Sequence, residues 1–280
     1  MDLFKRMSGE RHRMSKSYHI IADYIVEHSH RIPFLTTSSL SKATGVSEAT
    51  IVRFARFLNY EGYSDLQNQL MDSVEQRLST VERLRDSQGQ FTEKEKVVFD
   101  NFQTDMKNIQ TTMEQTQINK IEEVADTIMK ARRIYIIANR SAHSLGTFLQ
   151  YYLNILFGNS ELIHTTETSF DAIHNVNEQD LVIGISYARY TKSTLQAASF
   201  AKEKNATIIA LTDKPNSPIT AYADIALFAE SHMHSFLDSF VAPLSVINTL
   251  IAFIGNQNPK LVEERLAKFE AIWNKYDVFY

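Results

Sequence analysis

Apolar residues recur along the chain in two different patterns, and the change comes near residue 132. Upstream of that point they recur at helical spacing within polar, charged stretches. The stretches that predict helices on this pattern are 15–29, 37–58 (as two short helices), 64–86 and 93–131. Pro33 would end the first of them, and a polar break at 86–90 marks a hinge or domain boundary.

Downstream, short apolar runs alternate with helix-length segments. Unbroken apolar runs of this length are typical of strands buried on both faces, and they cover 134–138, 181–185, 207–211 and 224–228. The helical patterns between and after them cover 143–157, 192–204, 236–256 and 260–276. This alternation predicts an α/β fold with a three-layer, doubly wound parallel sheet, preceded by an all-helical domain.

Composition narrows the class of protein. The chain has 280 residues, is 44% hydrophobic and 22% charged, and so is globular, with a length that suggests two domains. It contains no cysteine, which excludes disulfides, thiolate metal sites and a cysteine nucleophile, and fits a reducing, cytoplasmic location. The uncharged stretch Ser239–Pro259 is too polar for a bilayer, so no membrane partner is expected.

The net charge of −4 hides an asymmetry between the two ends. Residues 1–70 hold 9 Lys and Arg against 7 Asp and Glu, whereas residues 71–280 hold 20 against 26. A near-neutral head on an acidic body suggests that the two ends have different partners.

A turn between two short helices stands out in the head. Gly45 suits the left-handed position of such a turn, and Val46 is apolar and can pack between the helices. Ser47 is a good N-cap, and Glu48 suits the positive end of the helix that follows.

The second of these helices carries two different faces. Ile51, Phe54, Ala55 and Leu58 form one apolar stripe that predicts a core contact. The opposite face is small and polar at its start and carries arginine, as reading of the DNA major groove requires; its residues are Ala49, Thr50, Arg53 and Arg56. The alternative is an ordinary turn followed by a solvated face.

The sequence from Ser15 to Leu70 resembles the N-terminal domain of the RpiR family of bacterial transcription regulators. The most specific part is the run GVSEATIVRFAR, followed by GYSDL at Gly62–Leu66. The resemblance implies a helical domain that binds double-stranded operator DNA. By matching positions it implies DNA contacts at Lys42, Ser47, Thr50, Arg53 and Arg56.

A second group of polar residues follows two of the predicted strands. Asn139-Arg140-Ser141 comes after the first, and the stretch Ser186–Thr191 comes after the strand over 181–185. Ligands of open parallel sheets bind beyond the carboxyl ends of the strands, and the helix that follows each loop offers free N–H groups to an anion. Hydroxyls at Ser141, Ser186 and Thr191 add donors for phosphate oxygens.

This half, over roughly 120–255, resembles the SIS (sugar isomerase) domain through LVIGISYARYT, ATIIALTD and SPI. The resemblance implies Ser141, Ser186 and Thr191 as phosphate ligands of a phosphorylated sugar. The family's loops normally carry glycine, and the second normally reads Ser-x-Ser-Gly-x-Thr, but here both loops lack glycine and each has an arginine. We therefore expect Arg140 or Arg189 to pair with phosphate or carboxylate. Otherwise these arginines form structural ion pairs, with Glu167 or Asp171, in a degenerate pocket.

An isomerase is the alternative from another class. It needs acid and base groups, for which the sequence offers Glu167 with His164, and Glu230 with His232 and His234. No third ligand clusters with the histidines, so neither a metal nor another cofactor is expected. A fused DNA-binding head has no evident use in an isomerase and favours a sensor.

The sequence thus predicts three parts: a helix-turn-helix domain over 1–80, a helical connector over 81–120 and a SIS-type sensor over 121–280. Two heads reading a palindromic site predict a homodimer or a dimer of dimers. A third possibility is a dimerising protein without ligand, in which an apolar stripe from Val241 to Ile254 serves as subunit interface or as core.

Overall fold

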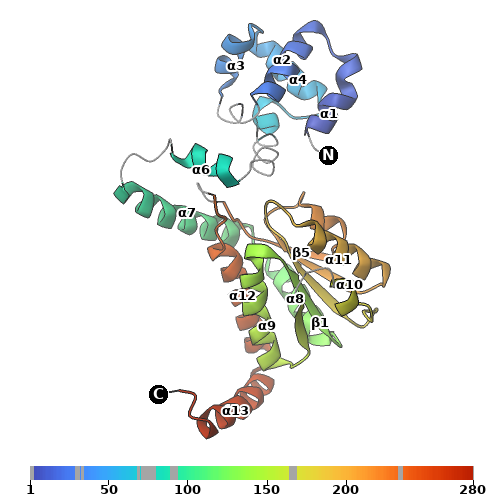
Figure 1. The fold of residues 1–280 in the computed structure, drawn as a ribbon, viewed down its shortest axis with the longest axis vertical. Coiled ribbons are helices and arrows are strands. Elements are labelled where there is room, and N and C mark those ends of the chain that lie inside the picture. The colour runs from blue at the N-terminus through green and yellow to red at the C-terminus, as the bar shows by residue number, and fades with distance from the viewer. Residues whose placement is uncertain are drawn as a thin grey trace. The chain divides into compact units, whose positions relative to one another are not determined.

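The structure, a computed structural model, describes residues 3–28, 32, 35–67, 70, 80–88, 94–163, 169–232 and 236–279. The chain divides into two compact units, Met1–Val81 and Glu82–Tyr280 (Figure 1). Each unit has a separate hydrophobic core, as the sequence pattern predicts.

The first unit is helical. Its described helices are α1 (Leu3–Glu10), the 3-10 turn η1 (Arg11–Arg13), α2 (Lys16–Glu27), α3 (Thr37–Thr44) and α4 (Glu48–Phe57). The predicted helix over 15–29 is α2, capped by the side chain of Ser15, which accepts a hydrogen bond from the Tyr18 N–H. Helix α1 was not predicted. It forms in a charged stretch because Leu3 and Met7, one turn apart, are both buried in the core.

Three helices lead into the second unit: α6 (Thr80–Gln88), α7 (Lys94–Gln115) and α8 (Ile118–Lys130). The stretch 93–131, predicted to be helical, contains two helices, because Gln117 is extended and separates α7 from α8. This break lets α8 turn a buried stripe, made by Ile121, Val124, Ala125 and Ile128, onto the core. Part of the predicted break at 86–90 is helical, since α6 continues to Gln88, and residues 89–93 lie outside the described part.

The second unit is built on a five-stranded parallel sheet in the order β2-β1-β3-β4-β5. The strands are β1 (Ile134–Ala138), β2 (Ser160–Ile163), β3 (Leu181–Ile185), β4 (Thr207–Thr212) and β5 (Ile225–Phe228). Strand β2, at the edge, was not predicted. Since β1 has β2 on one side and β3 on the other, the strand order reverses between β1 and β3, which is where open α/β sheets bind ligands.

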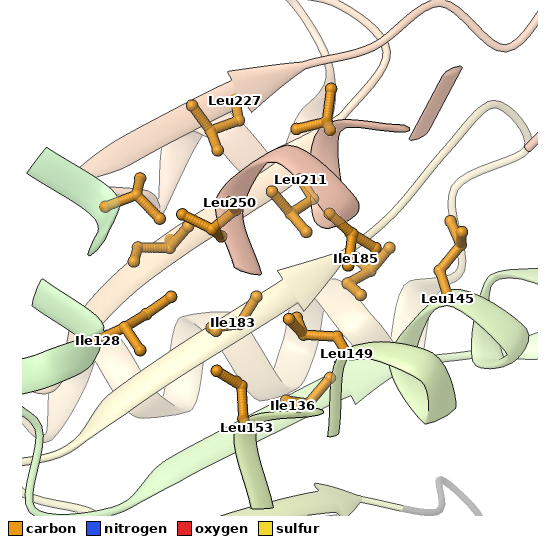
Figure 2. Close-up of a cluster of buried hydrophobic side chains, with 14 of the residues drawn as sticks. Ile128, Ile136, Leu145, Leu149, Leu153, Ile183, Ile185, Leu211, Leu227 and Leu250 are labelled. Atoms are coloured by element: carbon orange, nitrogen blue, oxygen red, sulfur yellow. The ribbon is translucent and has the colours of Figure 1, made fainter. Parts of the chain in front are cut away.

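Helices cover both faces of the sheet. On one face the core joins α8 and two further helices, α9 (His143–Leu156) and α12 (Val241–Gln257), and Figure 2 shows this cluster around Ile136, Ile183 and Leu211. On the other face lie α10 (Ser169–Ala172) and α11 (Lys192–Glu203). The last helix, α13 (Pro259–Lys275), contacts α9 and α12. The three-layer prediction is confirmed.

The apolar stripe on α12 that the sequence offered as a subunit interface belongs mainly to this core. Ile247 and Ile254 are fully buried in it, and Leu244 and Ile251 pack against it. Among the helices that the structure describes, none combines the length and the apolar character that a bilayer span needs.

Close packing fixes where α9 begins relative to the sheet. A Cβ at Gly146 would lie 2.8 Å from the Cβ of Ala138, so only glycine lets α9 approach the end of β1 this closely. At Gly184 in β3 an added Cβ would lie 2.5 Å from Cδ1 of Ile219, the end of a side chain that can shift, so this position is less restricted. The close approach at Gly146 therefore fixes the start of α9 against the end of β1.

Candidate functional site

The turn between α3 and α4 has the backbone that the sequence predicts. Thr36 caps α3, its hydroxyl accepting a hydrogen bond from the Ser39 N–H at 3.1 Å. The helix ends at Gly45, whose φ of +69° is the left-handed conformation that glycine adopts without strain. Val46 is buried in the core beside this turn, so the angle between the helices is fixed by packing as well as by the turn.

The two faces of α4 are divided as predicted. Its apolar stripe is buried in the core of the first unit; the residues are Ile51, Phe54, Ala55 and Leu58. Burial of this stripe determines which side of α4 remains for a partner.

Of the five residues expected at DNA, Thr50, Arg53 and Arg56 lie on α4 outside this stripe, Ser47 precedes α4 as its N-cap residue, and Lys42 lies on α3. Four of them are exposed and Thr50 is half-buried; the four are Lys42, Ser47, Arg53 and Arg56. The Thr50 hydroxyl accepts a hydrogen bond from the Arg53 guanidinium at 3.1 Å and lies 2.8 Å from the Ser47 hydroxyl. Ser47 occupies the N-cap position, but its side chain bonds to Thr50 instead of capping a backbone N–H, so that part of the expectation is wrong.

The second group of predicted residues gathers at the carboxyl ends of β1 and β3. Ala138 is paired with Ile185 in the sheet, so Asn139 and Ser186 follow at adjacent strand ends. The Asn139 amide donates to the Thr194 hydroxyl at 2.7 Å and ties the end of β1 to the first turn of α11. The two loops that the sequence singled out therefore lie together.

Both arginines of these loops have a left-handed backbone. Arg140 has a φ of +56° and Arg189 a φ of +62°, a region that costs a residue with a Cβ about 1–2 kcal/mol. Arg189 stands where the related loop normally has glycine, and it keeps a glycine-type conformation. Strain of this kind gathers at functional sites, where the surroundings enforce it. Arg140 makes no ion pair with any residue that the structure describes.

Ser186 begins the loop after β3 and has a buried hydroxyl. Its Oγ makes no hydrogen bond to the described residues, while its carbonyl accepts one from the Thr212 hydroxyl at 2.6 Å. A buried hydroxyl without a partner costs about 1–3 kcal/mol, which a ligand oxygen would offset. Thr191 is the N-cap residue of α11 and Ser141 lies in the short turn η3 (Arg140–Ala142).

A carboxylate that was not predicted as a site residue lies beside this loop. Asp213 follows β4 directly, and the Tyr190 hydroxyl bonds to it. Burial raises the pKa of the Asp213 carboxyl, while Lys214 and the hydrogen bonds from Tyr190 and Thr212 act in the opposite direction. Burial also raises the pKa of Tyr187. The only sequence signal was the position of Asp213 at a strand end.

The residues considered for an isomerase do not form a described acid–base cluster. His164, Glu167 and His234 lie outside the described residues, so the alternative ion pair with Glu167 is also outside them. Glu230 and His232 have backbone contacts with α7: the Glu230 N–H donates to the Thr112 hydroxyl and the His232 carbonyl accepts from Asn108. Over the described ranges, no three His, Asp or Glu side chains are grouped to hold a metal.

Family comparisons agree with both halves. A model described as helix-turn-helix domain, rpiR family, matches residues 1–77, and a model described as SIS domain matches residues 127–253. An HTH-type transcriptional regulator of Caldanaerobacter subterraneus subsp. tengcongensis is 28% identical over 249 residues, covering 85% of this chain and 84% of the relative.

Solved structures show the same fold. The sugar isomerase domain of an RpiR transcription factor from Sphaerobacter thermophilus matches with a TM-score of 0.61 and 27% identity, over 63% of this chain and 99% of that one. The NanR protein of Vibrio vulnificus, complexed with ManNAc-6P, matches with a TM-score of 0.62 and 21% identity, over 98% of both chains. The predicted fold class is therefore confirmed.

Proposed function

Because the chain belongs to the RpiR family of helix-turn-helix transcriptional regulators and carries a SIS domain, we propose that a metabolite controls its affinity for DNA. Helix α4 reads an operator, and a phosphorylated sugar or related metabolite bound beyond β1 and β3 changes the operator affinity. Two sites and a coupling between them make this an allosteric regulator.

The observation that carries the ligand proposal is that the loops after β1 and β3 hold two left-handed arginines and a buried hydroxyl that makes no hydrogen bond to the described residues. Arg140 and Arg189 supply positive charge at adjacent strand ends, and Ser186 supplies a donor. Ser141 and Thr191 add hydroxyls at the starts of the helices that follow. An anion with several oxygens, such as a phosphate ester, satisfies these groups together. The ManNAc-6P bound by NanR, which shares the fold, supports the same ligand class.

The DNA proposal rests on the exposed face of α4. Arg53 and Arg56 project from a helix whose other side is anchored in the core, so the helix can enter a groove without unfolding. Ala49 and Ser47 are small, which allows close approach at the N-terminal end. Lys42 on α3 is exposed and would supply a phosphate contact.

A regulator accounts for the chain better than an isomerase does. The curated relatives it matches are named HTH-type transcriptional regulators, and an enzyme has no evident use for a DNA-binding head. A turnover assay on hexose 6-phosphates should show no isomerisation beyond the buffer rate.

The experiment that tests the proposal measures how binding at one site changes the affinity at the other. A duplex is first selected from a random-sequence pool by the full chain, and its affinity is measured by fluorescence anisotropy with and without a panel of sugar 6-phosphates that includes ManNAc-6P. We expect at least one member of the panel to shift the operator affinity at least five-fold. The same factor should appear when that sugar is titrated calorimetrically with and without the duplex. A sugar affinity that is identical in both titrations would reject the coupling.

A further inference from the structure

Helix α7 belongs to the second unit and packs against the rest of it through its polar side. Asn108 and Thr112 are buried. The Asn108 amide donates to the His232 carbonyl at 2.7 Å, the Thr112 hydroxyl accepts from the Glu230 N–H at 2.9 Å, and Asp105 pairs with the Ser239 hydroxyl. Polar side chains thus attach α7 to its own unit, which reverses the usual arrangement of a surface helix.

The apolar side of α7 is exposed instead. Five large apolar side chains of α7 are exposed, with exposed fractions from 53 to 67%; they are Val98, Phe99, Phe102, Met106 and Met113. At about 100° per residue these positions, with the half-buried Ile109, fall within an arc about 100° wide. Between Val98 and Met113 no charged residue lies within this arc. We call these six residues the α7 stripe.

We propose that the α7 stripe is the contact through which two copies of this chain associate. Phe99, Phe102, Met106, Ile109 and Met113 follow one another at alternating steps of three and four residues. This spacing is typical of helices that pair along their length, each side chain packing between those of the facing helix. The stripe therefore fits a second helix of the same kind better than it fits a loop or a strand.

The area of the stripe matches what a dimer needs. Its five most exposed side chains leave on the order of 100 Å² each open to water, or roughly 500 Å² on one helix. Apolar patches of this size on a single chain mark interaction sites. Two copies would bury roughly 1,000 Å² between the stripes alone, which reaches the lower bound of specific interfaces.

The apolar character of the α7 stripe also favours a second copy of this chain as its partner. The stripe is apolar along its whole length, so it complements itself and needs no partner of opposite charge. A two-fold axis brings the same patch of both chains together and closes the assembly at two. The pairing requires neither DNA nor a sugar, so it stands or fails independently of the proposed function.

The first test measures the mass of the full chain by light scattering at concentrations from 1 to 50 μM (on the order of working concentrations in vitro). We expect a dimer for the wild type and a monomer for the double variant Phe102→Glu/Met106→Glu, because charges cannot be buried in the pair. Lys107→Glu, also exposed on α7 but outside the stripe, is the matched control and should remain a dimer. A monomeric wild type, or a double variant that stays dimeric, overturns the proposal.

The absence of cysteine gives a second test that tolerates any folding defect of the charged variants. Single cysteines at Phe102, Met106 or Met113 are introduced into the full chain and oxidised under mild conditions. We expect at least one of them to form a disulfide-linked dimer on a non-reducing gel, while Lys107→Cys does not. If none cross-links more than Lys107→Cys, the stripes do not face each other and the proposal is overturned.

Discussion

The Tyr190 hydroxyl lies 2.8 and 2.9 Å from the two carboxylate oxygens of Asp213 and donates a hydrogen bond to that group. Tyr190 follows the left-handed Arg189 directly, and Asp213 follows β4 directly. The contact therefore ties the loop after β3 to the neighbouring strand end. Together with Thr191 at the start of α11, it holds the chain that directly follows Arg189.

Removing this tether should weaken the candidate ligand site. Tyr190→Phe removes one of the two hydroxyl groups that bond to the partly buried carboxylate, so we expect the free energy of unfolding to fall by about 1–2 kcal/mol. The affinity for a sugar phosphate should fall several-fold, because Arg189 is no longer held in place. Chemical denaturation and calorimetric titration measure the two effects.

Tyr151→Phe is the matched control, since Tyr151 is an exposed residue on α9. It should change neither quantity. A Tyr190→Phe variant with unaltered sugar affinity would remove the tether from the binding mechanism, whatever its stability.

The Asp213 carboxyl should also give the stability a distinct pH dependence. Burial raises its pKa in the folded state, so the protonated form contributes stability that is fully present below the ordinary aspartate range. That stability is lost as the pH rises through the raised pKa. Asp213→Asn removes the titrating group and keeps an oxygen for the Tyr190 hydroxyl.

We therefore expect Asp213→Asn to be at least as stable as the wild type at pH 7, with an advantage that shrinks as the pH falls towards 4. Denaturation curves at several pH values measure this difference. If instead the wild type becomes more stable relative to the variant as the pH rises towards 7, the hydrogen bonds and Lys214 lower the pKa of Asp213 by more than burial raises it.

The central parts of the fold could be predicted because their sequence signals are local. Unbroken apolar runs such as Leu181–Ile185 are recognisable as strands buried on both faces, and the spacing of Ile51, Phe54 and Leu58 identifies the buried side of α4. The edge strand β2 lacks such a run, because Ser160 and Glu161 are partly or fully exposed and leave only two buried positions. Helix α1 was missed for a related reason, since one buried pair within a charged segment sets no period.

Only part of the candidate ligand site could be predicted from the sequence. Position after a strand end identified Ser186 and both arginines, since parallel strands bring their carboxyl ends to one edge. The contact between Tyr190 and Asp213 joins loops 23 residues apart, and no spacing rule connects them. The left-handed backbone of Arg140 and Arg189 is likewise invisible in residue type, because arginine rarely adopts it. Only the missing glycines hinted at it.

The strain at Arg189 separates a ligand-binding role from a structural one. Glycine adopts its φ of +62° freely and alanine does not, so Arg189→Gly should be about 1 kcal/mol more stable than Arg189→Ala. Both variants lack the guanidinium, so both should bind a sugar phosphate at least ten-fold more weakly than the wild type. Thermal melting and calorimetry compare the pair.

The outcome that contradicts this view is specific. If Arg189→Gly binds the sugar as the wild type does, the arginine merely occupies a glycine position. Arg140, whose φ is +56°, offers an independent repeat of the comparison at the end of β1.

On the proposed DNA-binding surface, we expect Arg53 on α4 to read bases and Lys42 on α3 to contact phosphates. Arg53, whose guanidinium is oriented by the Thr50 hydroxyl, projects from the exposed side of the helix near its middle. We expect Arg53→Ala to lower operator affinity about ten- to hundred-fold and to relax the preference at one base pair. Lys42→Ala should weaken binding to all duplexes alike and reduce the salt dependence by about one phosphate contact. Anisotropy titrations over a range of salt concentrations on the selected duplex and on single-base variants measure both effects.

Arg11→Ala is the control for loss of one positive charge from the same unit. Arg11 is exposed, pairs with Asp23 on α2 and belongs to neither α3 nor α4, so its removal should change operator affinity less than three-fold. All three side chains are exposed, and the variants should melt close to the wild type. If Arg53→Ala and Arg11→Ala lose the same operator affinity, the unit attracts DNA by charge alone. Helix α4 would then not be the helix that recognises the base sequence.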